Sequence, residues 1–297
     1  MNADQRGLKT KFLSACICVY PRPNMLFRLV RPMLLVVALL SPAMAQTQSE
    51  VRAKRVIDDA IAALGGQKFL TMEDRVETGR GYSFYRGEVT GLDIAKISTR
   101  YVTVAEGKTG EELSMRERQS FGKNGDYGLL FREDGAWEIS YRGSMPLAKD
   151  RAERYKDTAL RDIFYILRIR LHEPGLIFES RGLDVIENQP VEVVDITDSQ
   201  NRVVTVYFHQ STKLPVQQKW SFRDPLTKDR DEEVTRFSRY REENGIQWPH
   251  QVMRERNRSK TYEMFAESVV INQDLTDSIF AVPDAVAPRS KTVPKKK

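Results

Sequence analysis

The sequence predicts an α+β protein that is mainly antiparallel β: one curved sheet of ten or more strands, with two helices that cover its concave side. Two observations carry this fold class. Most of the chain consists of short alternating runs rich in β-branched and aromatic residues, each bounded by turn residues. Only two stretches have helical periodicity, and no helix separates successive strands, which excludes a parallel sheet. A sheet of that size must curl or close.

Residues 1–45 read as an export leader. The stretch "MLFRLVRPMLLVVALLSPAMAQ" begins at Met25 with arginines at 28 and 31, continues with a short apolar run, and ends in small residues. The apolar run is shorter than the ~20 residues that span a bilayer. We therefore predict a signal peptide that is cleaved near Ala45/Gln46. Residues 1–24 are either an extension of it or precede the true start at Met25.

The charge of the chain is concentrated at its ends. The full chain has 47 basic and 41 acidic residues, which become 41 and 40 once six basic residues and one acidic residue of the leader are removed. Arg289, Lys291 and three final lysines lie in residues 284–297, which we predict to be a disordered basic tail. The remaining chain has no visible basic face, so nucleic acid is not expected as a partner. The tail could contact anionic lipid headgroups.

Cysteine is confined to the leader, at Cys16 and Cys18. A mature exported chain without cysteine has no disulfide, no thiol nucleophile and no thiolate metal ligand. Its stability must come from its core.

The order of elements follows from periodicity. Apolar residues at helical spacing predict a first helix that Gly65 and Gly66 end. Strands follow from about 74 to 144, with tight turns at "GKNGDYG" and "REDGAW". Residues 146–172 predict one long second helix with a wide apolar arc, and a meander of six or seven strands runs from Pro174 onwards. We expect a single domain over residues 46–283.

Residues that could carry catalysis or bind a metal are sparse. His172, His209 and His250 lie far apart and are expected at the ends of elements, so neither a metal nor a cofactor is predicted. The triplet at Gly107 lacks the glycine that a phosphate-binding loop needs five residues earlier. Asp195, in an otherwise apolar strand, is either a buried acid of raised pKa or the partner of a basic residue.

The stretch "RVVTVYFHQSTKLPVQQKWSF", residues 202–222, predicts a hairpin with one apolar face. We interpret that face as part of the inner wall of the curved sheet. Aromatic and aliphatic residues on such a wall either line a cavity for an acyl chain or form an ordinary core against the long helix. The sequence leaves both open.

These pieces together resemble a known family. The resemblance is carried by the segments "VTVYFHQSTKLPVQQKW" and "YREENGIQWPHQVM", by Asn272, and by the C-terminal stretch "DSIFAVP". The chain resembles the LolA/LolB-like superfamily, and most of all the bacterial exported proteins described as outer membrane lipoprotein-sorting proteins. The resemblance covers roughly residues 50–283. It implies an unclosed β-barrel with helices on its concave side, in a periplasmic, non-catalytic carrier or binder of lipids or lipidated proteins.

On this basis we expect an acyl chain to lie against residues of the hairpin, with the second helix as a lid. The expected lipid-binding residues are Val204, Val206, Phe208, Trp220, Phe222, Phe164 and Leu167. Two alternatives stay open. One is a structural or interaction protein of the envelope with a filled core, and the other is a hydrolase that uses Asp195 or Glu179.

Overall fold

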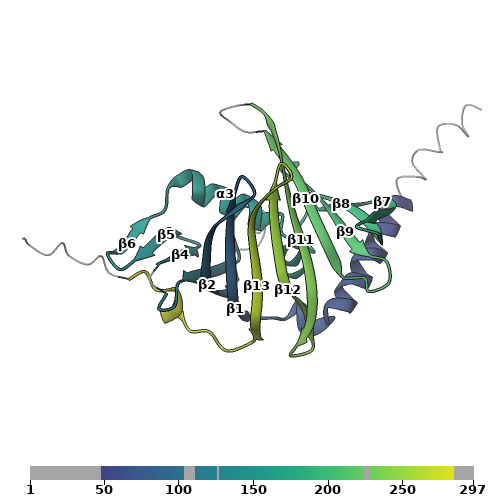
Figure 1. Ribbon diagram of the computed structural model, residues 1–297. Helices are drawn as coiled ribbons and strands as arrows, with labels where there is room; N and C mark the ends of the chain where they lie inside the picture. The colour runs from purple at the N-terminus through teal and green to yellow at the C-terminus, as the bar shows by residue number, and fades with distance from the viewer. Residues whose placement is uncertain (1–47, 104–110, 126, 224–227, 284–297) are drawn as a thin grey trace, which may run out of the picture. The chain divides into compact units, whose positions relative to one another are not determined.

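A single antiparallel sheet dominates the computed structural model, which describes residues 48–103, 111–125, 127–223 and 228–283. The predicted leader and basic tail lie outside these residues. Within them the sheet has thirteen strands in the order β6-β5-β4-β3-β2-β1-β13-β12-β11-β10-β9-β8-β7 (Figure 1). The strands are β1 Asp74–Tyr85, β2 Glu88–Tyr101, β3 Met115–Phe121, β4 Tyr127–Arg132, β5 Gly135–Ser140, β6 Gly143–Pro146, β7 Ile177–Ile186, β8 Gln189–Thr197, β9 Val203–His209, β10 Pro215–Arg223, β11 Arg230–Glu243, β12 Ile246–Arg256 and β13 Ser259–Ile271.

The strand order shows two meanders joined side by side. Strands β1 to β6 and β7 to β13 each follow chain order, and the two meanders meet where β1 pairs with β13. The edges of the sheet, β6 and β7, are the two strands that flank the central helices in sequence. The sheet is therefore antiparallel throughout and does not close, as predicted.

At the β1–β13 junction the two strands approach closely. The register shifts between Thr78 and Gly79, and a Cβ atom on Gly79 would lie 1.9 Å from the Phe265 carbonyl oxygen. Only glycine leaves room for this approach. The residue thereby permits the irregularity at the joint of the two meanders.

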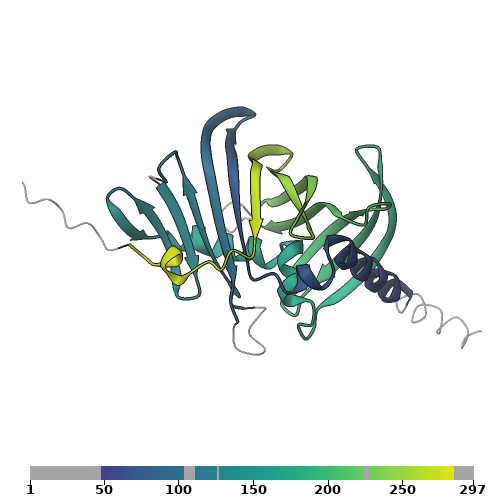
Figure 2. The same cartoon turned by 90° about the horizontal axis from the view of Figure 1, so that it is seen from below.

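The helical segments lie on the concave side of the sheet, as Figure 2 shows for the N-terminal helix and for the segment after α3. The first helix covers residues 48–64. It ends at Gly65 and Gly66, whose φ angles of 126° and 57° confirm the predicted stop. A short α2, Gln67–Leu70, leads into β1. Within the described residues, no helix is long and apolar enough to cross a membrane.

The predicted helix over residues 146–172 is wrong in its bounds. Pro146 ends β6, and two separate helical segments follow. The first is α3 (Lys149–Leu160), and the second consists of α4 (Ile163–Tyr165), which continues directly as a π-helix, η1 (Ile166–Arg170). The break has a local cause. The Asp162 carboxylate accepts hydrogen bonds from the backbone N–H groups of Phe164 and Tyr165, at 3.0 and 3.1 Å, and so begins a new helix.

The main core fills the space between the helices and strands β8 to β13. Alternate residues of the strands point inward, as the period of two requires, and the first helix contributes the apolar stripe predicted for it. The buried members are Ala53, Val56, Ile57, Ala60, Ile61, Leu64, Phe69, Met72, Ile163, Phe164, Ile166, Leu167, Val194, Ile196, Val204, Val206, Phe208, Trp220, Phe237, Ile246, Trp248, Ala266, Val269 and Ile271.

Part of the other face of the sheet, over β3 to β5, is covered by the C-terminal segment. Phe131 stacks on Tyr155 of α3, so its neighbour Leu130 points to the opposite face. There Leu130 and Ile139 bury Phe280 of the 3₁₀-helix η2 (Asp277–Phe280). Residues 277–280, at the C-terminal end of the predicted domain, thus form a strap across β3 to β5.

Candidate functional site

The seven residues predicted to bind lipid do come together. Val204, Val206 and Phe208 alternate along β9, and Trp220 and Phe222 lie on the neighbouring β10. Phe164 of α4 and Leu167 of η1 face them from the helical side. Six of the seven are buried in the main core, and Phe222 is half-buried against it.

The space between these residues is filled by the protein itself. The Phe164 ring lies 5.0 Å from that of Phe237 and 4.8 Å from that of Trp248, and Leu167 is fully buried. An acyl chain can reach these side chains only if the residues above them move. Whether they bind lipid therefore stays a prediction.

We call residues 162–170, which comprise α4 and η1, the lid segment. Its α-helical part has three residues, less than one turn, and continues as a π-helix, a geometry that is often found at functional sites. Its start is held by two side chains: Asp162, and Gln218 of β10, whose Oε1 accepts a hydrogen bond from the Ile163 N–H at 2.9 Å.

The end of the lid segment is anchored by a buried ion cluster. Arg170 donates from Nε and Nη2 to Glu173, at 2.7 and 2.9 Å, and from Nη2 to Asp198 at 2.9 Å. Asp198, in the β8–β9 turn, also accepts from Arg202 Nε at 2.6 Å. Burial alone would raise the pKa of Asp198, but the hydrogen bonds from both arginines lower it below its usual value.

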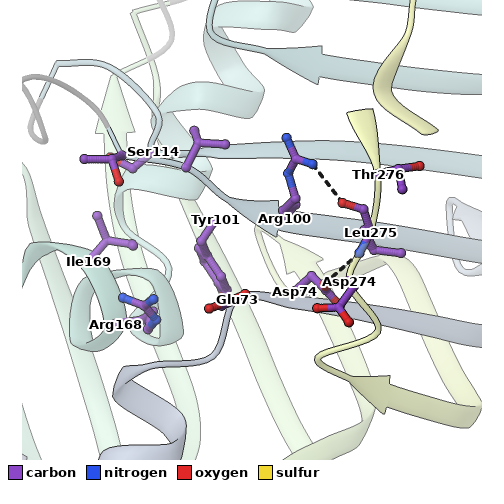
Figure 3. Close-up of a pocket in the computed structure, with 12 residues that line it drawn as sticks. Glu73, Asp74, Arg100, Tyr101, Ser114, Arg168, Ile169, Asp274, Leu275 and Thr276 are labelled. Carbon is purple, nitrogen blue, oxygen red and sulfur yellow. Dashed lines mark hydrogen bonds between the residues drawn. The ribbon is translucent and has the colours of Figure 1, made fainter. Parts of the chain in front are cut away.

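An open pocket of about 710 Å³ lies beside the lid segment (Figure 3). Five parts of the chain form it: the start of β1, the end of β2, the residue before β3, the π-helix and the stretch before η2. Its lining residues are Glu73, Asp74, Arg100, Tyr101, Val102, Thr103, Ser114, Arg168, Ile169, Asp274, Leu275 and Thr276. The size suits a small-molecule site, yet most of these side chains are polar.

On one side of the pocket, the charged side chains already form hydrogen bonds within the protein. The buried Asp74 carboxylate accepts hydrogen bonds from the backbone N–H groups of Gln273 and Leu275, at 2.8 and 2.9 Å. Arg100 donates to the Leu275 carbonyl at 2.8 Å, drawn in Figure 3, and pairs with Asp277. These groups fix the C-terminal strap.

The other side retains unused donors. Arg168 donates from Nε to the Met72 carbonyl at 3.1 Å, and its guanidinium carbon lies 5.3 Å from the centre of the Tyr101 ring. Burial lowers the pKa of Arg168. Ser114 is buried; its N–H donates to the Tyr165 hydroxyl, whereas its Oγ has no hydrogen-bond partner among the described residues.

Tyr101 separates the pocket from the core. Its ring packs against the main core cluster, and its hydroxyl accepts a hydrogen bond from Arg75 Nη1 at 2.7 Å. Burial raises the pKa of Tyr101. The ring stands in Figure 3 between the Arg168 side and the Arg100 side of the pocket.

The residues considered for catalysis or metal binding are dispersed. His172 follows η1, and His209 ends β9, where its Nδ1 accepts from two turn N–H groups. The expectation of an element end is wrong for His250, which is buried inside β12 with Nε2 3.1 Å from Glu243 Oε1. Among the described residues, no group of three histidine, cysteine or acidic side chains is arranged to hold a metal ion.

Asp195 takes the second of the two roles left open for it. Its carboxylate accepts from Arg181 Nε and from Thr205 Oγ1, both at 2.7 Å. Glu179 is its cross-strand partner on β7. Asp195 is therefore an ion-pair partner on the face away from the lid segment.

Sequence reasoning missed the pocket because its residues come from segments far apart in the chain. One signal was present. Asn272, which belongs to the family-like C-terminal pattern, accepts from the Glu73 N–H at 2.9 Å and so joins two of the lining segments.

Comparison of the sequence with protein-family models gives no match, and comparison with curated proteins gives none either. Solved structures do match. A DUF1329 family protein from Desulfovibrio piger has a TM-score of 0.53 at 13% identity, over 77% of this chain and 97% of that one. This likeness shows the fold alone.

Two further structures match at lower scores. An outer membrane lipoprotein-sorting protein domain from Vibrio parahaemolyticus gives a TM-score of 0.49 at 12% identity, over 78% of this chain and 97% of that one. The LolA superfamily protein NE2245 from Nitrosomonas europaea gives 0.48 at 11%, over 77% and 97%. The fold therefore rests on the first match and on the strand order: the chain shares the fold of the DUF1329 family structure and has one unclosed antiparallel sheet, as predicted.

Proposed function

We propose that the protein is an exported, non-catalytic binding protein of the periplasm that holds a lipid or a lipidated partner by its acyl chain. The chain would lie under the lid segment, against Val204, Val206, Phe208 and Trp220. One observation supports this most: the apolar half of the sheet is covered at this place by a short π-helical segment rather than by a long helix.

The free energy of burying an acyl chain is large enough to replace contacts within the protein by contacts with the ligand. Burying an acyl chain releases about 0.8 kcal/mol per methylene. A chain of many methylenes can therefore offset the loss of the contacts that Phe164 and Leu167 make in the ligand-free protein. Binding requires the lid segment to move away from the sheet. We expect the hinges of this movement at its two ends, Asp162 and Arg170.

The first experiment is solvent extraction and mass spectrometry of protein purified from its native periplasm. The second is titration with a fatty acid that carries a nitroxide quencher. Trp220 and Trp248 lie in the main core, whereas Trp137 packs on the opposite face beside Phe280. We expect quenching of the two core tryptophans, and not of Trp137.

Matched variants assign the signal. Trp137→Phe retains the two core tryptophans, and the double variant Trp220→Phe, Trp248→Phe retains only Trp137 as the control. A protein that carries no lipid from its native source, and whose core tryptophans are not quenched at any ratio of fatty acid, would end the proposal.

The filled core favours a second candidate, an envelope interaction protein without a lipid ligand. Its partner surface would be the edge strand β7, which among the described strands pairs only with β8 and which exposes Leu183 and Val185 by 69% and 64%. Such edges add strands from other chains. Crosslinking from positions on β7 that recovers a partner, together with absent lipid, would select this alternative.

A further inference from the structure

The pocket beside the lid segment contains a cation that is poorly compensated by the protein. Arg168 is half-buried, and its one hydrogen bond to the described residues uses Nε, which leaves both Nη groups without a partner there. A guanidinium offers five donors in a planar fork that suits carboxylate and phosphate. Burial lowers its pKa even though Glu73 lies nearby, so the local acids do not offset the cost of desolvation.

A second donor in the same pocket is independent of Arg168. Ser114 is 2% exposed, and its Oγ has no hydrogen-bond partner among the described residues. An unsatisfied buried hydroxyl costs free energy that a ligand can recover. In Figure 3, Ser114, Ile169 and Arg168 lie on the same side of the pocket.

The acidic residues of the pocket do not form hydrogen bonds with Arg168 or Ser114 among the described residues, so these two donors remain available to a ligand. Asp74 is occupied by two backbone N–H groups on the opposite side. Glu73 and Asp274 are exposed, so water screens their charge. Glu73 is the acid whose charge acts on Arg168, and it is therefore the natural competitor of an anionic ligand.

We propose that this pocket binds the oxyanion of an acidic amphiphile, a carboxylate or a phosphate, through Arg168 and Ser114. The proposal rests on the proposed function and specifies the class of its ligand. Leu167 and Arg168 are consecutive residues of η1, and one faces the core while the other lines the pocket. A headgroup at Arg168 thus lies next to the place where the acyl chain would enter.

The experiment measures binding of a fluorescent fatty acid and of its methyl ester to the full chain. Both probes have the same chain, and only the acid has a charge. We expect the acid to bind about tenfold more tightly, a factor that one charge-assisted hydrogen bond can supply. Arg168→Gln should abolish the difference between the probes, while Glu73→Gln should strengthen binding of the acid roughly two- to threefold.

Arg118→Gln is the matched control. Arg118 is likewise half-buried and donates one hydrogen bond to a backbone carbonyl, that of Ile279 at 2.9 Å, but it lies outside the pocket. We expect it to leave the ratio of the two affinities unchanged. Urea unfolding of all three variants checks that each is folded.

The outcomes separate the two proposals. Equal binding of acid and ester overturns the oxyanion site and leaves the lipid-binding function standing, whereas binding of neither probe overturns that function. If inorganic phosphate alone binds in an Arg168-dependent manner and the fatty acid does not, the site takes free phosphate, and the amphiphile proposal is wrong. Loss of the charge preference in Arg118→Gln would also contradict it.

Discussion

At the scale of single residues, the most consequential group is the buried ion cluster that anchors the lid segment. Asp198 and Arg170 are almost fully buried, and each of the three guanidinium nitrogens of Arg170 donates at least one hydrogen bond. Removing one member of such a cluster leaves an uncompensated buried charge, which costs about 3–5 kcal/mol. Nothing in the local sequence of Asp198 distinguishes it from a solvated turn aspartate.

The first prediction concerns acid stability. Hydrogen bonds from Arg170 and Arg202 hold the folded-state pKa of Asp198 below its unfolded value of about 3.9. The stabilisation is therefore fully present above that value and is lost as the pH falls toward the lower folded pKa. Urea unfolding between pH 7 and pH 3 should show a steeper acid loss for the wild-type protein than for Asp198→Asn, which should already be less stable at pH 7.

Asp277→Asn is the control for this prediction. Asp277 also pairs with two arginines, Arg100 and Arg116, but it is exposed to solvent. Water and salt screen such a pair, so its removal should have much the smaller effect at pH 7. Equal effects of the two substitutions would show that burial of the Asp198 cluster contributes nothing.

At the scale of elements, the break between α3 and α4 shows what periodicity does not detect. The apolar pattern runs through residues 159–171 without a gap, which is why one helix was predicted. A side chain that accepts the N–H groups of the next turn competes with continuation of the helix. Asp162 does so, and the result is a separate lid segment.

The second prediction tests this cap. Burial raises the pKa of Asp162, so its ionised form lowers stability at neutral pH, and this penalty disappears as the pH falls below the folded pKa. Asparagine keeps the acceptor without the charge. Unfolding free energies at pH 7 should rank Asp162→Asn equal to or above the wild-type protein, and Asp162→Ala about 1 kcal/mol below it.

The same series contains its own check on the charge. At acid pH the wild-type protein should approach the Asn variant, because both caps are then neutral. If Asp162→Asn is as unstable as Asp162→Ala at pH 7, the charge itself stabilises the lid segment, and the explanation by desolvation fails.

At the scale of the whole molecule, two meanders share one sheet, and apolar clusters lie on both of its faces. The main core lies under the first helix and the lid segment, while Phe280 closes a smaller cluster on the other face of β4 and β5. Three strands hold this strap in place: Arg100 of β2, Arg118 of β3 and Arg132 of β4 each donate to a backbone carbonyl of residues 275–280.

The third prediction compares the two clusters. Phe280→Ala should cost about 3–5 kcal/mol and speed hydrogen exchange first in β4 and β5, because it leaves a cavity under the strap. Phe208→Ala, an equally buried phenylalanine of the main core, should instead loosen β8 to β10. Equal loss of protection over both regions in both variants would mean that the two clusters unfold as one unit.

The sequence by itself determined the antiparallel sheet, the first helix with its glycine stop, and the apolar faces of β9 and β10. These follow from short-range periodicity and turn chemistry, which act over a few residues. Alternation also assigned Val204, Val206 and Phe208 to the inner face of β9, where they are buried, whereas their binding of lipid stays a prediction.

Only the tertiary structure decided what those faces contact and where the pocket lies. The helices cover Val206 and Phe208, because apolar side chains of residues 53–64 and 163–167 belong to the same buried cluster. The pocket brings Arg168 and Ser114 together from segments 54 residues apart in the chain. Such proximity depends on how strands pair across the sheet, and no local pattern contains it.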